Sequence, residues 1–274
     1  MKFADLHLHT SFSDSTYTPE EVVREAARVG LCAIAIVDHD TLDGVPAALS
    51  AGKKYNVEVL SGIELTAQYE NLEVHMLGYL IDHNYEPFKE RLEVLRKIRI
   101  ERIYKIVDRI KTVGVDLNPD TVFNLAQGST VGRLHVARAM VKDGLVDSVA
   151  AAFKTYIGDK CPGYVLGFRL TPKEAVELIK EAGGIPVLAH PYIISKDRVL
   201  AEIIDCGIMG LEVYYPEHSQ STVNFYLDLA KKHDLLVTGG SDFHGDAKPE
   251  IKIGSIKLAY EFVEKLKAAK PQTK

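Results

Sequence analysis

The chain has 274 residues, of which 46% are hydrophobic and 26% charged, and its formal net charge at pH 7 is −5. This composition is typical of a globular protein with a sizeable core, and the length suits an α/β barrel with an insertion. The negative charge argues against a broad basic surface for nucleic acid, and no apolar run approaches the roughly 18 residues of a membrane span. Because no signal-peptide pattern opens the chain, we expect a cytoplasmic protein. We also expect no obligate protein partner.

Strand and helix patterns alternate through the first 83 residues. The expected order is a strand and turn over 3–10, helix 19–30, strand 32–37, helix 44–55, and strands 57–65 and 73–79. His7 and His9 stand two apart on the first strand, where side chains project to the same side, so together they make half of a metal site. The second strand ends in Asp38-His39-Asp40, and His75 lies within the last.

The alternation breaks after residue 83 and resumes near residue 166. A long charged helix is expected over 86–113, followed by shorter helices over 119–126, 132–142 and 148–156. The later elements are expected as a helix from Thr171, strand 185–189, helix 198–206, strand 210–214, helix 220–233, strand 235–239, a strand near 251–256 and helix 260–269. About seven strands with interleaved helices predict an irregular (β/α)7 barrel over 1–83 and 166–274, with an inserted all-α subdomain over 84–165.

Metal-type side chains gather at the predicted strand ends, where β/α barrels carry their active sites. They are His7, His9, Asp14, His39, Glu64, His75, His190, Asp242 and His244. Six of the ten histidines fall in this set, which ordinary core histidines would not do. Nine nitrogen and oxygen donors exceed the needs of one ion and indicate two or three, with Zn, Mn or Fe equally suited.

Such a cluster suits hydrolysis of an anionic ester, because a bound divalent ion lowers the pKa of water to about 7 and neutralises phosphoryl oxygens. Two other classes stay open from the residues alone. An amidohydrolase or deaminase barrel also opens with His-x-His but usually adds a carboxylated lysine, and no lysine stands at a predicted strand end. A non-catalytic metal-dependent binding module is the second, although an intact ligand set argues against it.

The motifs Asp-Leu-His-Leu-His-Thr, Val-Asp-His-Asp, Ser-Gly-Ile-Glu, Ala-His-Pro and Gly-Ser-Asp-Phe-His-Gly, in this order, resemble the polymerase and histidinol phosphatase (PHP) superfamily of metal-dependent phosphoesterases. The resemblance implies three divalent ions. It places one at His7, His9, Glu64 and Asp242, a second at Glu64, His75 and His190, and a third at Asp14, His39 and His244.

Motifs in the insertion narrow the resemblance to one subgroup of the superfamily. Residues 132–140, 156–158 and 162–165 are similar to the small bacterial members that act on nucleotides. This implies removal of phosphate from 5′-mononucleotides such as AMP or from 3′,5′-nucleoside bisphosphates. Alternatives are 5′-to-3′ exoribonuclease activity on short RNA ends and a histidinol-phosphate-type phosphatase.

Four further residues are candidate substrate contacts. Arg133 offers a planar fork suited to phosphate, and His135, two residues on, would add a second donor when protonated. Lys160 and His218 are weaker candidates for contact with a phosphate or leaving group. Each also has a plain alternative as a solvated helix or loop residue.

Overall fold

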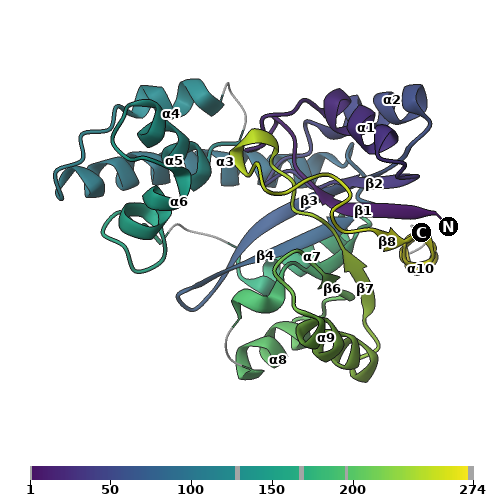
Figure 1. Cartoon of the computed structure of the whole chain (residues 1–274). Coiled ribbons are helices and arrows are strands. Elements are labelled where there is room, and N and C mark those ends of the chain that lie inside the picture. Colours follow the sequence, from purple (N-terminus) through teal and green to yellow (C-terminus); the bar gives the residue numbers. More distant parts are fainter. Residues whose placement is uncertain (1, 127–129, 167–169, 195–196, 271–274) are drawn as a thin grey trace.

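The computed structural model describes residues 2–126, 130–166, 170–194 and 197–270 (Figure 1). Eight strands form one sheet. They are β1 Phe3–Leu8, β2 Ala33–Ile36, β3 Glu58–Tyr69, β4 Leu72–Tyr79, β5 Ile185–Leu188, β6 Gly210–Tyr214, β7 Leu236–Gly239 and β8 Leu258–Ala259. The predicted α/β class and irregular barrel are confirmed.

The sheet curls into a nearly closed barrel with the strand order β7-β6-β5-β4-β3-β2-β1-β8. Strands β1, β2 and β3 are parallel, as are β5, β6 and β7, and β4 runs antiparallel to both of its neighbours. Closure comes from the residues after β7. The His9 amide donates to the Phe243 carbonyl over 3.1 Å, and the Asp242 amide donates to the His7 carbonyl over 2.9 Å. The ends of β1 and β7 therefore meet.

The prediction of a strand near 251–256 is wrong. The sheet also has eight strands where about seven were expected. Residues 250–257 form turns, and the last strand is the two-residue β8, antiparallel to β1. The Gly254 amide donates to the Asp5 carboxylate over 2.9 Å at a φ of +76°. Ile251 and Ile253 pack with a hydrophobic cluster that includes Leu8 and Ile34, so their alternation reflects packing against neighbours without strand pairing.

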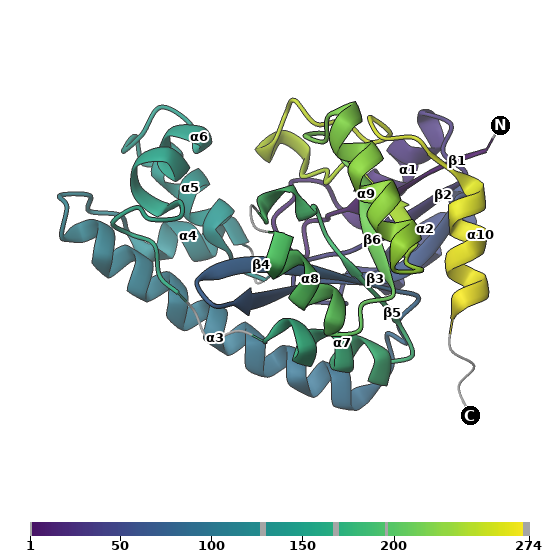
Figure 2. The same ribbon diagram turned by 90° about the horizontal axis from the view of Figure 1, so that it is seen from below.

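In the described part of the chain, helices that alternate with the strands lie around the outside of the sheet (Figures 1 and 2). They are α1 Pro19–Arg28, α2 Val45–Tyr55, α7 Pro172–Glu181, α8 Asp197–Asp205, α9 Gln220–Lys232 and α10 Tyr260–Ala269. The two predicted Thr-Pro helix starts are confirmed. Thr18 and Thr171 each accept from a backbone amide three residues on, and the glutamate there accepts from the threonine amide, which is a capping box.

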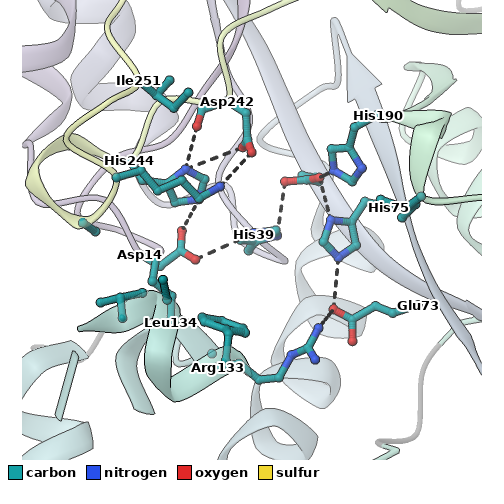
Figure 3. A pocket seen from close by; sticks show the side chains of 18 of the residues that line it. Asp14, His39, Glu73, His75, Arg133, Leu134, His190, Asp242, His244 and Ile251 are labelled. Carbon is teal, nitrogen blue, oxygen red and sulfur yellow. Dashed lines mark hydrogen bonds and ion pairs between the residues drawn. The ribbon is translucent and has the colours of Figure 1, made fainter. Parts of the chain in front are cut away.

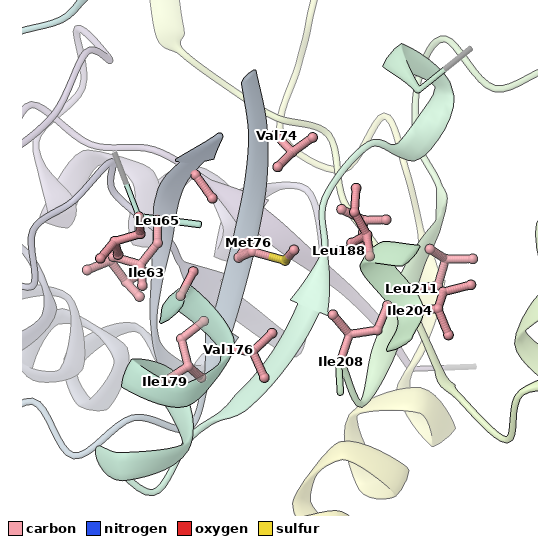
Figure 4. Packing of buried hydrophobic residues seen from close by; sticks show 14 of the residues in the cluster. Ile63, Leu65, Val74, Met76, Val176, Ile179, Leu188, Ile204, Ile208 and Leu211 are labelled. Atoms are coloured by element: carbon pink, nitrogen blue, oxygen red, sulfur yellow. The ribbon is translucent and has the colours of Figure 1, made fainter. Parts of the chain in front are cut away.

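Strand alternation directs the site residues inward. Ile63 and Leu65 on β3, with Met76 on β4, join an outer hydrophobic cluster against α7 (Figure 4). Glu64 lies between the first two and therefore faces the opposite side of the sheet, as His75 does next to Met76. The same pleat that buries the core thus presents a carboxylate and an imidazole to the barrel interior.

A helical segment occupies the connection between β4 and α7. It comprises α3 Glu86–Lys111, α4 Pro119–Ala126, α5 Arg133–Lys142, α6 Val149–Ala152 and a π-helical turn, Phe153–Ile157. Its own hydrophobic cluster includes Ile106 and Met140, whereas Phe88 and Leu92 at the start of α3 join the barrel's cluster. The long helix α3 therefore connects the two cores. Over the described residues, no helix has both the length and the apolar character needed to cross a membrane.

Candidate metal centre

The structure brings all nine predicted metal-type side chains to one end of the barrel. Figure 3 labels Asp14, His39, His75, His190, Asp242 and His244 among them. They arrive from the end of β1 and its following loop, from the segment after β2, from β3 and β4, and from the segments after β5 and β7. The parallel strands contribute through their carboxyl ends, and β4 contributes from its amino-terminal half because it runs in the opposite direction. Segments up to 237 residues apart in sequence thus meet in one cluster, from His7 to His244.

Glu64 is the central carboxylate. It is fully buried, and its Oε1 lies 2.8 Å from His75 Nδ1 and 3.0 Å from His190 Nε2. Its Oε2 lies within 3.4 Å of a ring nitrogen of each of His7, His9 and His39. A carboxylate with donors on both oxygens is arranged to bridge two cations.

Within the described residues, three groups of donor atoms are compact enough to hold an ion, with all their ligand atoms within 4.8 Å of one another. They are His7, His9, Glu64 and Asp242; His9, Asp14, His39 and His244; and His39, Glu64 and His75. The first group equals the set that the resemblance implies for one ion. The second is the implied set Asp14, His39 and His244 with His9 added. The third corresponds to the implied set Glu64, His75 and His190 but has His39 in place of His190, although His190 Nε2 still lies 3.0 Å from Glu64 Oε1.

The chemistry of these donors fits divalent cations. His9 Nε2, Asp14 Oδ1 and His39 Nδ1 are buried and make no well-directed hydrogen bond, although Glu64 or His244 lies 3.2–3.3 Å from each of them. A polar atom buried in this way is costly. The His9 ring lies 4.2 Å from that of His244 and 4.7 Å from that of His39, centroid to centroid. A cation between these atoms would satisfy all of them, and the lack of thiolates among the donors suits Zn, Mn or Fe.

Charges in the cluster keep the carboxylates ionised. Burial by itself would raise the pKa of Glu64, but His39, His75 and His7 together hold that pKa well below its usual range. The pKa of Asp14 is lowered in the same way, against burial, chiefly by His244 and His39. Deprotonated carboxylates are the form that binds a metal ion.

Glu212 supports two of these histidines, and sequence reasoning missed it. It is fully buried on β6, where its Oε1 lies 2.9 Å from His7 Nδ1 and its Oε2 accepts from the His190 amide over 2.7 Å. The Nδ1–H of His7 is thereby directed to Glu212, which leaves Nε2 to face Glu64 and Asp242. A lone glutamate in the apolar strand Gly-Leu-Glu-Val-Tyr was the available signal.

Asp242 is held from outside the centre by Tyr215 and Lys248, which were also missed. The Tyr215 hydroxyl and the Lys248 ammonium each lie 2.8 Å from Asp242 Oδ2, while Oδ1 faces His7 and His9. Asp242 and His190 have backbone φ of +55° and +26°, conformations that cost energy and concentrate at functional sites. Nothing in the sequence distinguishes Lys248 from a surface lysine.

A cavity of about 860 Å³ opens onto the centre, lined by Asp14, His39, Glu64, His75, His190, Asp242 and His244 and by residues of the helical segment. Its volume is at the upper end of the range of roughly 300–1,000 Å³ for ligand pockets. Arg99, Arg102 and Arg133 lie in its wall. Each of these arginines is paired with a carboxylate: Arg99 with Asp40, and Arg102 and Arg133 with Glu73.

The sequence model of the PHP domain family matches residues 5–159. The chain belongs to the PHP family. A 5′-3′ exoribonuclease of Haemophilus influenzae is 31% identical over 88% of this chain and 89% of its own length. A 3′,5′-nucleoside bisphosphate phosphatase of Chromobacterium violaceum is 30% identical over 91% of this chain and 90% of its own.

Two solved structures have the same PHP-type architecture. A Bifidobacterium adolescentis protein assigned as a metal-dependent phosphoesterase has a TM-score of 0.90 and 32% identity over 98% of this chain and 96% of its own. A Chromobacterium violaceum structure named as an amidohydrolase, with bound sulfate and no metal, has a TM-score of 0.87 and 27% identity over 97% and 96%. The predicted family is therefore confirmed, and with it metal-dependent phosphoesterase chemistry.

Arg133 is the one predicted substrate contact that lines the cavity of this PHP protein, among the described residues. Its guanidinium bonds Glu73 over 3.2 Å and Asp159 over 3.0 Å, and it lies 5.8 Å from the ring centroid of Phe153 and 5.4 Å from that of Tyr164. Glu73 also lies 3.3 Å from His75 Nε2. Glu73 thus connects Arg133 to His75, one of the candidate metal ligands.

The other three predicted contacts lie outside the described lining of that cavity. His135 is buried at the start of α5, its Nδ1 accepts from the Gly132 amide, and burial lowers its pKa to about 4. Burial therefore favours the neutral ring, so the structure gives no support to a protonated second donor at His135. Lys160 is exposed on a turn, and the Nδ1–H of His218 donates to the Val213 carbonyl over 2.7 Å.

Proposed function

We propose that this protein hydrolyses the phosphate ester on the 3′ side of a 5′-phosphorylated nucleotide, with three divalent ions at the nine clustered side chains. The observation that carries the proposal is the joining of two features in one cavity. One is a set of three compact donor groups that share His9, His39 and Glu64. The other is Arg133, which bonds Glu73, and Glu73 in turn lies 3.3 Å from His75 Nε2.

Bound divalent ions supply a strong nucleophile at neutral pH and neutralise the oxygens of a reacting phosphoryl group. The chain's part is to position them. Glu64 and His9 are shared between neighbouring groups and would fix the spacing of the ions. Glu212 holds His7 through its Nδ1. Asp38 holds the loop that carries Asp14, because it accepts from the Thr10 amide over 2.7 Å and from Ser13 Oγ over 2.6 Å.

The names of two relatives support the choice of ester. One is a 3′,5′-nucleoside bisphosphate phosphatase and the other a 5′-3′ exoribonuclease. An enzyme that shortens RNA from its 5′ end can release a mononucleotide by cutting at the first 3′ oxygen. A bisphosphate offers a phosphate on that same oxygen, so one site with a 5′-phosphate pocket can serve both substrates.

Arg133 is the proposed holder of the 5′-phosphate, which is not cleaved. Its side chain is 17% exposed and that of its partner Asp159 is 57% exposed. Asp159 is therefore placed to give way to a phosphate, which binds a guanidinium in the same two-pronged manner. Glu73, whose side chain is 12% exposed, would keep its contact with the guanidinium.

Three alternatives remain distinguishable by substrate. Release of phosphate from AMP would indicate a 5′-nucleotidase, and preference for histidinol phosphate a histidinol-phosphate-type phosphatase. The amidohydrolase hypothesis requires a lysine near the metal ions, and Lys248 lines the cavity. Its ammonium, however, lies 2.8 Å from Asp242 Oδ2. That pairing favours a charged ammonium over a carboxylated side chain that binds metal.

The deciding experiment measures product release from adenosine 3′,5′-bisphosphate, AMP, p-nitrophenyl phosphate and histidinol phosphate, each with and without Mn²⁺. We expect metal-dependent turnover, with the highest kcat/KM on the bisphosphate. Glu64→Gln should abolish turnover, and Glu202→Gln, on the outer surface of α8, is the matched control. Hydrolysis that is equally fast with chelator, or no hydrolysis of any phosphate ester, would refute the proposal and leave a binding module as the better hypothesis.

A further inference from the structure

An exposed aromatic ring borders the cavity on the side of β6. Tyr192 lies in a short 3-10 turn, Pro191–Ile193, directly after His190, and it is 43% exposed. Its ring stacks on that of Tyr215, with centroids 5.5 Å apart and an interplanar angle of 29°. Large apolar side chains in the wall of a polar cavity often mark a place where a ligand ring packs.

The Tyr192 ring is backed by fixed groups. Tyr215 is 6% exposed and its hydroxyl donates to Asp242 Oδ2, which ties the stack to the metal-binding residues. His218 meets Tyr192 edge-on, with centroids 5.6 Å apart, and its Nδ1–H donates to the Val213 carbonyl. A ring held in this way loses little conformational freedom when a ligand stacks on it.

Tyr192 and Arg133 lie at opposite ends of a chain of contacts that passes through the metal-binding residues. Arg133 bonds Glu73, Glu73 lies beside His75, and His75 and His190 both approach Oε1 of Glu64. The His190 ring in turn lies 5.4 Å from that of Tyr215, on which Tyr192 stacks. Figure 3 shows His190 on the far side of His75 from Arg133. A substrate with a phosphate at Arg133 and an ester at the metal ions would therefore continue toward Tyr192.

We propose that Tyr192 stacks on the base of the second nucleotide of a 5′-phosphorylated RNA end. This inference rests on the proposed function. In the reaction, water adds to the phosphorus and the bond from phosphorus to the 3′ oxygen of the first nucleotide breaks. That oxygen takes the second proton of the water, and the remaining RNA keeps the phosphate on its 5′ oxygen. The second nucleotide thus stays on the attacked phosphorus, and a bisphosphate substrate has no such base.

The test compares 5′-phosphorylated diadenylate, the same dinucleotide with an abasic second residue, and adenosine 3′,5′-bisphosphate. Tyr192→Ala should raise KM for the diadenylate about fivefold to 150-fold, the range expected for loss of one stacked base, and leave KM for the bisphosphate unchanged. Tyr192→Phe should keep the wild-type constants, because the stack is preserved. Phe225→Ala, which removes a ring that is 50% exposed on α9, is the matched control.

Two results would overturn the inference. One is an equal change of KM on diadenylate and bisphosphate, which would assign Tyr192 to the first nucleotide or to the fold. The other needs no variant: wild-type protein that binds the abasic dinucleotide as tightly as the intact one has no stacking contact there. Equilibrium binding of a hydrolysis-resistant phosphorothioate dinucleotide to the Mn²⁺-loaded protein makes the same comparison without turnover. If no dinucleotide or bisphosphate is hydrolysed, the proposed function is refuted, and the binding experiment still tests the stacking contact on its own.

Discussion

Replacement of Glu212 by glutamine tests whether a residue that touches no substrate controls metal binding. Glu212 accepts two hydrogen bonds at once, from His7 Nδ1 over 2.9 Å and from the His190 amide over 2.7 Å, and it is fully buried. A glutamine has one oxygen, so its amide nitrogen must face one of these two donors. One charge-assisted bond is lost, worth roughly 1.5–3 kcal/mol.

That loss should appear in metal affinity. With the Nδ1–H of His7 no longer directed to a carboxylate, the ring loses its fixed orientation toward Glu64 and Asp242. Loss of such a partner typically costs about tenfold to a hundredfold in metal affinity. Titration of metal-free Glu212→Gln with Mn²⁺ or Zn²⁺ by calorimetry, beside wild type and Glu202→Gln, measures the effect. Unchanged affinity with a lowered melting temperature would refute the reasoning and make Glu212 a purely structural residue.

Three further predictions follow from the same centre. Protein reconstituted with Mn, Fe or Zn should hold close to three ions per chain by elemental analysis, and one ion or none would rule out the trinuclear arrangement. Arg133→Ala should raise KM for the bisphosphate roughly tenfold or more and leave p-nitrophenyl phosphate unchanged, whereas a fall in kcat for both would place Arg133 at the reacting phosphoryl group. Burial depresses the pKa of His135 from 6.5 to about 4, so its contribution to the free energy of unfolding is complete above pH 6.5 and is lost as pH falls toward 4; His135→Gln should flatten this part of the stability profile measured by urea denaturation, and an unchanged slope would assign it to other groups.

The sequence by itself determined the class of fold and singled out the nine side chains of the candidate metal centre. His7 and His9 two apart on a strand, and single histidines or carboxylates at later strand ends, are local patterns that a barrel must bring together. The threonine caps of α1 and α7 were equally readable, since a capping box lies within four residues. These features depend on strand alternation and helix starts, which short sequence windows encode.

The tertiary structure decided what lies around those residues. Glu212, Lys248 and Tyr215 act on His7 and Asp242 through contacts between segments far apart in the chain, and no local pattern predicts such a contact. His135 shows the converse, because its position beside Arg133 suggested a phosphate contact but α5 turns it into the interior. The alternation at 251–256 likewise predicted a strand, whereas hydrogen bonding to Asp5 made a turn. Burial and long-range hydrogen bonding belong to the folded chain as a whole, and they set which polar groups are charged, held or available to a ligand.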